Sequence, residues 1–484
     1  MRQTSRRKFF EESMIATALA AGGAAVGQAV AADATGSKSD SPNERIRHAV
    51  IGCRIRGKVH ASSFGRIPGV EIAYVCDPDS QLSAELATAV EEQHGKRPQV
   101  VQDLRRIFDD PNVDTVSIAA PNHWHALAAI WAMQSGKDVY VEKPVSHNVD
   151  EGRRIVQVAH KLGRICQAGT QNRSRGDLAA AAEYIRQGKL GEIGLIRTIM
   201  YGRRGSIGGP GKCDIPPHVD FNLWLGPATD MHPTRPRLHY DWHWVWDTGG
   251  GELANNNIHY VDICRWLAGL QGLGDSVLSF GGRLGYEDAG QTPNTQVVVH
   301  RYGPQTIIQE VRGLKSDPFS SKFKAGHVIH GSEGFIAEGS LFDPEGQMVR
   351  TFKGPGVNHF ANFIDCVRSR RREDLKAEIL EGHLSTSLCH LGNISYRLGQ
   401  SQSPSEITQQ LEAADMPREV ITTLERMTGH LRDHGVKLDQ TPLTAGPLLK
   451  IDNANEKFVD NQAADRLLSR EYRRPFVVPA ASEI

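Results

Sequence analysis

Short apolar runs alternate with longer amphipathic stretches from residue 46 onward, and this alternation constrains the fold more than any other feature of the sequence. Strands are predicted at 46–51, 70–76, 113–120 and 138–142, and helices at 58–66, 80–94, 126–134 and 149–162. Strands that alternate with helices form a parallel sheet with right-handed crossovers. The pattern therefore predicts an α/β fold whose N-terminal part is a doubly wound parallel sheet of the dinucleotide-binding kind.

A glycine-containing turn, GCRIRG at residues 52–57, follows the first predicted strand. A dinucleotide-binding turn of the form G-x-G-x-x-G uses its glycines for the tight bend, for close approach to the pyrophosphate and for packing of the next helix. Gly52 and Gly57 match the first and third positions, and Arg54 occupies the middle one. The Arg54 side chain either reaches the pyrophosphate or lies away from the site. An ordinary surface turn is the alternative interpretation of the whole motif.

Asp77 stands twenty residues after Gly57, at the end of the second predicted strand. An acid at this place accepts hydrogen bonds from the ribose hydroxyls of NAD and repels the 2′-phosphate of NADP. We therefore expect Gly52, Arg54, Gly57 and Asp77 to lie at a cofactor site that favours NAD over NADP.

Two further motifs directly follow predicted strands, PNHWH at 121–125 and EKP at 142–144. In an open α/β sheet the carboxyl ends of the strands form the ligand crevice. A lysine in that crevice can donate a hydrogen bond to a substrate hydroxyl and favour its ionised form, whereas an exposed surface lysine is the alternative for Lys143. The proline at 144 allows a cis peptide bond. The cofactor contacts predicted along this edge are Pro121, Asn122, His125, Glu142 and Lys143.

The glycine turn with its acid, the Pro-x-x-x-His motif and the Glu-Lys-Pro motif occur in one order along the chain. This order resembles the Gfo/Idh/MocA family of oxidoreductases, which includes glucose–fructose oxidoreductase and inositol dehydrogenase. The resemblance runs from about residue 46 to residue 396. It implies an NAD(P)-dependent dehydrogenase acting on CH–OH groups. It also implies a Rossmann domain followed by an α+β domain, whose large, open, mainly antiparallel sheet covers the active site and often mediates oligomers.

The second half of the sequence agrees with that architecture. Strands are predicted at 195–201, 276–280, 295–301, 306–311 and 327–330, and helices at 359–366 and 379–396. We expect an NAD(P)-binding Rossmann domain at 45–170 and a substrate and oligomerisation domain at 171–398. Residues 399–484 form a C-terminal extension of unknown role, which either wraps the domain or pairs subunits.

The segment GGGELANNNIHYVD at 249–262 resembles the family pattern G-G-x-L-x-D-x-G-x-H-x-x-D. In the family the aspartate and the histidine, four residues apart on one helix face, point at the substrate. His259 matches the histidine, but Asn255 replaces the aspartate and Asn257 replaces the glycine. Asparagine can orient a hydroxyl or an imidazole but cannot ionise. The resemblance thus implies Lys143, His259 and Asn255 as catalytic residues.

His259 is the expected base, because an imidazole titrates near the working pH. A histidine that merely packs within a helix is the alternative. Trp242, Trp244 and Trp246 alternate just before this segment. If the chain is extended there, the three indoles share a face that can stack on a sugar ring, whereas core packing is the alternative for at least two of them. By their position in the motifs, Asn122 and His125 are expected near the same crevice, together with residues 171 and 172.

The first 32 residues resemble a twin-arginine export signal. Arg6 and Arg7 precede two phenylalanines, a weakly apolar run extends from 14 to 32, and AVA at 29–31 offers small residues to a signal peptidase. Residues 33–44 are polar and are predicted to be a linker. We expect a periplasmic or secreted protein. A membrane anchor, and a cytoplasmic enzyme whose N-terminus imitates a signal, are the alternatives. No later segment of the sequence is long and apolar enough to span a bilayer.

Charge and cysteine content exclude several other classes of protein. The 56 basic and 56 acidic side chains leave no excess of positive charge for a nucleic-acid backbone. The seven cysteines form no C-x-x-C pair and the 20 histidines form no H-E-x-x-H motif, so we expect no metal site. The expected partners are a sugar or polyol substrate and further copies of the chain.

These motifs predict hydride transfer between a nicotinamide cofactor and a secondary hydroxyl or carbonyl of a sugar, polyol or inositol. Export to a compartment without free NAD would require a cofactor that is retained and recycled within each turnover. Two alternatives stay open: a redox-neutral NAD-dependent glycosidase or lyase, and a sugar-binding protein that has lost turnover. Arg54 and Asn255, which both depart from the family pattern, motivate the second alternative.

Overall fold

The structure, a computed structural model, describes residues 45–211, 213–229, 232–235, 237–321, 323 and 325–484. The predicted export signal at 1–32 and the predicted linker at 33–44 lie outside these residues. Residues 45–484 form one compact unit. Of the helices in the described ranges, none combines the length and the apolar character needed to cross a membrane.

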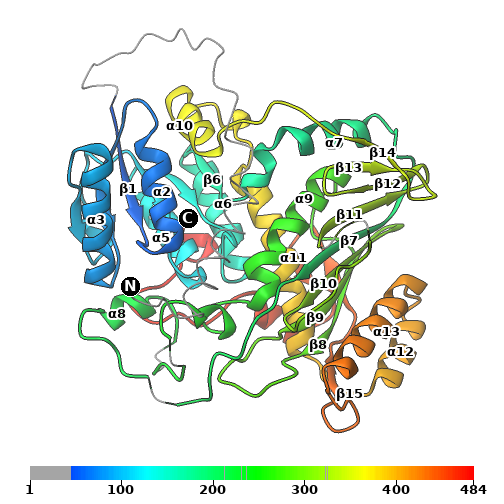
Figure 1. Cartoon of the computed structure of the whole chain (residues 1–484). Coiled ribbons are helices and arrows are strands. Elements are labelled where there is room, and N and C mark those ends of the chain that lie inside the picture. Colours follow the sequence, from blue (N-terminus) through cyan, green and yellow to red (C-terminus); the bar gives the residue numbers. More distant parts are fainter. Residues whose placement is uncertain (1–44, 212, 230–231, 236, 322, 324) are drawn as a thin grey trace, which may run out of the picture. The chain divides into compact units, whose positions relative to one another are not determined.

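A parallel sheet comes first in the described chain. Its strands lie in the order β3-β2-β1-β4-β5-β6, with helices connecting successive strands (Figure 1). Its elements are β1 (Ile46–Ile51), α2 (Ile55–Gly65), β2 (Val70–Cys76), α3 (Ser80–His94), β3 (Gln99–Val101), α4 (Arg105–Phe108), β4 (Thr115–Ile118), α5 (Asn122–Gln134), β5 (Asp138–Val141), α6 (Val149–Lys161) and β6 (Cys166–Ala168). The strands pair in parallel throughout. The predicted doubly wound Rossmann sheet is confirmed.

The strand order reverses between β1 and β4, and this reversal places the first two sequence motifs side by side. In such a sheet the carboxyl ends of the two strands flank the ligand crevice. The glycine turn follows β1, and the PNHWH motif follows β4. A Cβ atom at Gly52 would lie 2.6 Å from the carbonyl carbon of Ala119, so the two loops are in direct contact.

Two helices begin earlier than the hydrophobic pattern predicts. Helix α2 begins at Ile55, three residues before the predicted start, and α5 begins at Asn122, four residues before it. The first turn of each is rich in polar residues, and apolar periodicity therefore misses it. Pro121 has an extended backbone with φ of −58° and ψ of 152° directly before α5, and this φ is the one that the proline ring imposes.

A second, larger sheet follows the Rossmann sheet. Its strands lie in the order β14-β13-β12-β11-β7-β10-β9-β8-β16-β15, with β17 paired to β8 and β18 paired to β17. The strands are β7 (Ile193–Tyr201), β8 (Ser276–Gly282), β9 (Thr295–Tyr302), β10 (Gln305–Arg312), β11 (Gly326–Gly331), β12 (Gly334–Ala337), β13 (Ser340–Phe342), β14 (Met348–Thr351), β15 (Gln400–Gln402), β16 (Leu443–Ala445), β17 (Leu449–Asp452) and β18 (Lys457–Phe458). Strands β7 and β10 pair in parallel, and the other pairings within the described ranges are antiparallel. The predicted mainly antiparallel second sheet is confirmed.

Helices cover both faces of the β8–β10 part of this sheet. The remaining helices are α7 (Gly176–Arg186), α8 (Phe221–Leu225), α9 (Ile258–Ala268), α10 (His359–Ser369), α11 (Ile379–Arg397), α12 (Pro404–Ala413), α13 (Arg418–Asp433) and α14 (Gln462–Asp465). Because side chains alternate along a strand, Val298 packs with α9 and α11, whereas Val297 and Val299 pack with α12 and α13 (Figure 1). The first part of the C-terminal extension therefore packs on the sheet.

The last part of the chain returns to the Rossmann domain. The Phe476 ring lies edge-on to the Trp124 ring, with 5.4 Å between ring centres, and also contacts Trp131. Val478 joins the same apolar cluster. The extension, in which the sequence offers no motif, thus supplies strands of the second sheet and also packs on the Rossmann domain.

Candidate active site

The glycine turn lies at the carboxyl end of β1 in a conformation that needs both of its glycines. Gly52 has a φ of +88°, in the region that favours glycine. A Cβ atom at Gly57 would lie 1.8 Å from the carbonyl oxygen of Gly52, and only glycine therefore lets α2 approach the turn this closely. No side chain caps the start of α2, so its first N–H groups can hold a phosphate. The turn fits the pyrophosphate of a dinucleotide.

Asp77 lies at the carboxyl end of β2, next to this turn. Its carboxylate accepts hydrogen bonds from the backbone N–H groups of Cys53 at 2.8 Å and Asp79 at 2.9 Å. Burial raises the pKa of Asp77, and the two hydrogen bonds oppose that shift. Each carboxylate oxygen can accept a second hydrogen bond, for example from a ribose hydroxyl. The position of Asp77 therefore fits its predicted contact with ribose.

Arg54 is directed away from the turn. Its Nη1 donates to the carbonyl oxygen of His239 at 3.0 Å, and its guanidinium lies 5.6 Å from the centre of the Tyr240 ring. Of the two orientations that the sequence leaves open, this geometry favours the one in which Arg54 does not hold the pyrophosphate.

Glu142 is the centre of a buried polar network at the end of β5. Its Oε1 accepts hydrogen bonds from Arg56 (Nε at 3.0 Å, Nη2 at 2.5 Å), from His60 Nε2 at 3.0 Å and from Gln171 Nε2 at 3.1 Å. Burial alone would raise the pKa of Glu142, but Arg56 and His60 hold it well below its usual range. A permanently ionised Glu142 therefore ties α2 to β5 and fixes the backbone that presents Lys143.

Lys143 reaches from the Rossmann domain to the second domain. Its Nζ donates to the backbone carbonyl oxygen of Asn255 at 2.5 Å. Desolvation lowers the pKa of Lys143, and the charge of Glu142 works in the opposite direction. The Lys143–Pro144 peptide bond is cis. The alternative of an exposed surface lysine is wrong, since the side chain is half-buried between the two domains.

His125 connects the ends of β4 and β5. Its Nδ1 lies 2.6 Å from the carbonyl oxygen of Pro144 and its Nε2 lies 2.8 Å from that of Ala120. Burial lowers the pKa of His125, and a neutral imidazole carries one N–H, so it donates to one carbonyl at a time. Pro121 and Asn122 begin α5 beside it, and no side chain caps that helix. Cofactor contacts of these three residues stay predictions.

His259 lies in the first turn of α9, close enough to Lys143 to sense its charge. Desolvation, and then the charge of Lys143, lower the pKa of His259 to about 3. This direction runs against the expectation that His259 titrates near neutral pH, because burial disfavours the charged imidazole, and its role as the base stays a prediction. Its Nδ1 is buried and has no hydrogen-bond partner among the described residues. A neutral imidazole keeps one ring nitrogen with a free lone pair, which can accept a hydrogen bond.

Asn255 lies in a π-helix, Leu253–Asn257, that runs into α9. Such wide turns occur often at functional sites. Its backbone carbonyl holds Lys143, while its side-chain Nδ2 lies 3.4 Å from Glu252 Oε2. Asn257 donates instead to Gln309 Oε1 at 2.7 Å, away from this group. The structure thus brings Lys143, Asn255 and His259 together across the junction of the two domains.

Glu252 and Arg204 form a buried ion pair that the sequence motifs did not indicate. Arg204 Nη2 lies 2.8 Å from Glu252 Oε1, and the Glu252 side chain is 0% exposed. Asn256 Nδ2 donates to the same oxygen at 2.5 Å. A lone acid in the otherwise neutral GGGELANNN stretch is the one sequence signal that could have pointed to this pair.

His243 adds a second buried imidazole to this group. Its Nε2 has no partner among the described residues, and desolvation lowers its pKa to about 4. It belongs to a 3-10 helix, Asp241–Trp244, so the condition under which the three tryptophans would share one face, an extended chain, is not met. Trp244 is buried there, consistent with core packing. The described residues contain no group of three or more His, Cys, Asp or Glu side chains that could hold a metal ion.

Two family descriptions match the sequence. Residues 46–170 match the Gfo/Idh/MocA "oxidoreductase family, NAD-binding Rossmann fold", and residues 210–428 match its "oxidoreductase family, C-terminal alpha/beta domain". Together the two regions cover more than half of the chain.

Curated relatives include two proteins of Shewanella. A glycosyl hydrolase family 109 protein of Shewanella pealeana is 32% identical over 154 residues, which cover 31% of this chain and 34% of the relative. An alpha-N-acetylgalactosaminidase of Shewanella oneidensis is 31% identical over 155 residues, with the same two coverages. The chain thus spans about a third of the length of these relatives.

The fold is also similar to that of solved structures. The WlbA dehydrogenase of Bordetella pertussis, in complex with NADH and UDP-GlcNAcA, aligns with a TM-score of 0.54 and 21% identity, over 73% of this chain and 97% of that one. The parallel sheet and its glycine turn agree with the Rossmann domain that the first family description gives. The chain therefore belongs to the Gfo/Idh/MocA oxidoreductase family, with the family's NAD-binding Rossmann fold matched at residues 46–170 and its C-terminal α/β domain matched at residues 210–428.

Proposed function

We propose that this chain is an NAD-dependent dehydrogenase that transfers a hydride between its cofactor and a secondary carbinol of a sugar, polyol or inositol. The observation that carries the proposal is the hydrogen bond from Lys143, at the carboxyl edge of the NAD-binding sheet, to the Asn255 carbonyl, which brings the lysine near enough to His259 on the adjoining helix for its charge to lower the pKa of that imidazole. NAD, when bound at the glycine turn, supplies the hydride acceptor. The protein supplies the groups that orient the carbinol and take its hydroxyl proton.

Lys143 and His259 have different roles toward the substrate hydroxyl. The neutral imidazole of His259 accepts a hydrogen bond from the substrate hydroxyl, and the ammonium of Lys143 stabilises the developing alkoxide. Desolvation lowers the pKa of both groups, and interacting groups titrate as a pair. The Lys143 ammonium has no free lone pair, so the hydroxyl proton passes to the imidazole of His259. Asn255 cannot accept it, but its carbonyl oxygen holds Lys143 Nζ in place.

Hydride exchange with the bound cofactor tests this function. The purified full chain is denatured and the supernatant is assayed for nicotinamide dinucleotide. Intact protein is then incubated with sugars and polyols deuterated at their ring carbons, and the cofactor is analysed by mass spectrometry. Deuterium in the cofactor is expected. Bound cofactor that gains no deuterium would favour the alternative of a sugar-binding protein without turnover.

The names of the Shewanella relatives favour a second candidate, a redox-neutral glycosidase or lyase. In that scheme the same carbinol is oxidised transiently, the glycosidic bond is broken and the product is reduced again by the same retained cofactor. A panel of aryl glycosides that includes the α-N-acetylgalactosaminide distinguishes the two functions. Released sugar of unchanged oxidation state indicates the glycosidase, whereas paired oxidised and reduced sugars indicate the dehydrogenase.

We further propose that the chain is exported by the twin-arginine route and assembles as a homo-oligomer. Arg6 and Arg7 before two phenylalanines support the first part. Fractionation of cells that express the full chain should place it in the periplasm, and replacement of both arginines by lysine should leave it in the cytoplasm. Light scattering of the purified protein measures the oligomer.

A further inference from the structure

A loop region from the second domain lies across the edge of the Rossmann sheet where ribose is expected. We call residues 213–229, 232–235 and 237–247 the cover. The backbone carbonyl of His239 in the cover accepts a hydrogen bond from Arg54 at 3.0 Å. The Nε2 atom of the same histidine lies 2.9 Å from Asp79 Oδ2. The cover thus contacts the glycine turn and the β2–α3 loop together.

Backbone contacts add to this attachment. Ser80 N–H donates to the carbonyl of His218 at 3.0 Å, and Asp220 N–H donates to that of Pro78 at 2.9 Å. Val219 forms an isolated β-bridge with Asp79. None of these contacts uses the Asp77 carboxylate, which accepts hydrogen bonds from the backbone N–H groups of Cys53 and Asp79. The cover therefore lies around the ribose site without using its acid.

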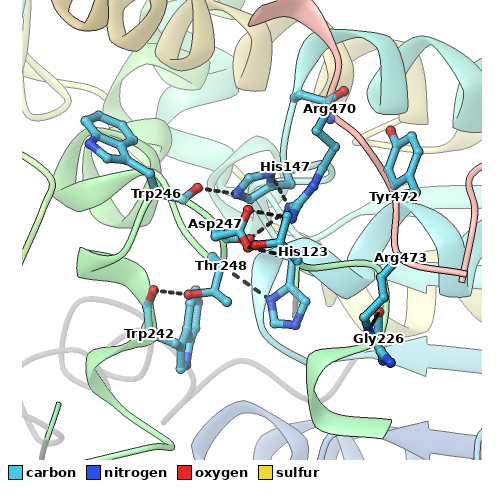
Figure 2. Close-up of polar contacts among 12 residues, drawn as sticks. His123, His147, Gly226, Trp242, Trp246, Asp247, Thr248, Arg470, Tyr472 and Arg473 are labelled. Atoms are coloured by element: carbon cyan, nitrogen blue, oxygen red, sulfur yellow. Dashed lines mark hydrogen bonds and ion pairs between the residues drawn. The ribbon is translucent and has the colours of Figure 1, made fainter. Parts of the chain in front are cut away.

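The C-terminal extension holds the cover from the other end (Figure 2). Arg470 Nη1 donates to the carbonyl of Asp247 at 2.8 Å, and its Nη2 donates to Asp247 Oδ1 at 2.7 Å. The same Nη1 lies 3.2 Å from His147 Nδ1, and His147 Nε2 lies 2.9 Å from the carbonyl of Trp246. The Arg470 side chain is 10% exposed. One arginine thus joins the end of the cover to the loop that follows the Glu-Lys-Pro motif.

Arg473, three residues further on, holds the start of the cover. Its Nε donates to the carbonyl of Gly226 at 3.0 Å, and its Nη1 and Nη2 donate to the side chain and the carbonyl of Asn222, each at 2.6 Å. Phe476 then anchors the extension on Trp124 of the Rossmann domain. A planar guanidinium that makes several such bonds is a rigid fastening.

We propose that the cover closes the ribose end of the NAD site and that Arg470 and Arg473 fasten it, so that NAD stays bound through successive turnovers. The inference rests on the proposed function only in placing NAD at the glycine turn. Arg54 is then a fastening residue rather than a phosphate ligand, which accounts for its departure from the glycine pattern. Arg470 and Arg473 contact neither Lys143 nor His259, so they act on cofactor release and not on the hydride step.

The rate of cofactor release tests the inference. The full chain is loaded with NADH, chased with excess NAD, and followed by the decay of NADH fluorescence. Arg470→Ala and Arg473→Ala are each expected to speed release about tenfold or more, the factor expected for losing charge-assisted hydrogen bonds. Asn222→Ala, which removes one Arg473 contact from the side of the cover, should act in the same direction more weakly. Arg418→Ala, at an exposed ion pair on α13, should leave the rate unchanged.

A second control separates release from general loss of stability. Leu424→Ala removes a buried side chain from α13, far from the cover, and should lower the melting temperature without changing NADH release. Equal release rates in wild type, Arg470→Ala and Arg473→Ala would overturn the cover and leave hydride transfer standing. Weaker NADH binding in Arg54→Ala, together with wild-type release rates in Arg470→Ala and Arg473→Ala, would make Arg54 a phosphate ligand and overturn the cover as well. Wild-type protein that binds no NADH would overturn both proposals.

Discussion

His259 is held in its neutral form at neutral pH, because lost solvation and the nearby charge of Lys143 lower its pKa to about 3. Lys143 itself loses basicity on burial, although Glu142 opposes that shift. The hydrogen bond to the Asn255 carbonyl orients the lysine side chain, and the charge of the neighbouring Glu142 carboxylate favours its protonated form. The pKa values of His259 and Lys143 therefore depend more on lost solvation than on the ordinary values of histidine and lysine.

Replacing Lys143 with alanine tests its role. We expect Lys143→Ala to lower turnover by about 10²–10⁴-fold, the usual contribution of a positioned proton-transfer or charge-stabilising group. The melting temperature should change little, since the side chain is half-buried. Lys96→Ala, which removes an exposed lysine of the same domain, is the matched control. Turnover near the wild-type value in Lys143→Ala would exclude the proposed role.

Glu151, at the start of α6, links stability to pH. Burial raises its pKa from 4.5 to about 7, while Arg470 and the His147 N–H oppose the shift. Between pH 4.5 and pH 7 the Glu151 carboxyl is ionised in the unfolded chain and protonated in the folded chain. The free energy of unfolding therefore falls as pH rises through this range, by up to about 3 kcal/mol in all. Glu151→Gln should therefore gain stability relative to wild type from pH 5 to pH 8. Thermal melts at both pH values measure this, and a constant difference would contradict it.

Helix α2 shows how a single element makes the cofactor site. Its start depends on Gly57, where any Cβ atom would meet the Gly52 carbonyl at 1.8 Å. Gly57→Ala should therefore cost about 1–3 kcal/mol of stability and abolish stoichiometric NAD binding, because backbone must shift to make room. Gly429 in α13 is also a helix glycine, but nothing lies within 4 Å of the place of its Cβ.

Gly429→Ala is the matched control and should stabilise the protein by up to about 1 kcal/mol, from the helix propensity of alanine. Denaturant unfolding and released-cofactor assays on both variants give the comparison. If Gly57→Ala kept full NAD occupancy, the close approach of α2 would not be needed for binding.

The α12–α13 pair covers one face of the β8–β10 part of the second sheet. Val297 and Val299 of β9 would face solvent without it, and they pack instead with residues such as Leu424. The β8–β10 part of the sheet is therefore covered within one chain. An oligomer that uses this sheet would have to contact its other strands, from β7 toward β14.

Buried neutral histidines should make the whole molecule sensitive to acid. Five of them, with pKa values lowered by burial to about 3 or 4, are His123, His243, His300, His359 and His390. In the unfolded chain these histidines take up protons below about pH 6.5, whereas in the folded chain they stay neutral. The free energy of unfolding is therefore undiminished above about pH 6.5 and decreases as pH falls toward 4. Each costs up to about 1 kcal/mol per pH unit while it stays buried.

We expect the melting temperature to fall steeply between pH 6.5 and pH 4, since five such groups outweigh the opposite effect of Glu151. Calorimetry across this range checks the expectation. A melting temperature that stayed flat down to pH 5 would show that these imidazoles take up protons without unfolding. His300→Gln, at a buried site away from the candidate active site, should make the slope shallower.

The sequence by itself determined the parallel sheet, the order of its motifs and the family that the chain resembles. These features depend on local signals: apolar runs, the glycines at 52 and 57, and an acid or a lysine directly after a strand. Such signals lie within a few residues of one another and have a period that matches a strand or a helix. The first turns of α2 and α5 were missed because their residues are polar. Alternation of the tryptophans does not by itself require an extended chain, and the structure forms a 3-10 helix at Asp241–Trp244.

Only the tertiary structure decided how these pieces meet. Arg470 and Asp247 are 223 residues apart, Arg54 and His239 are 185 apart, and Arg204 and Glu252 are 48 apart. No local pattern encodes such pairs, because each partner is an ordinary surface residue until the chain folds around it. The pKa of His259 likewise depends on how much water packing removes. Local chemistry can be read along the chain, whereas burial and long-range pairing exist only once the core has formed.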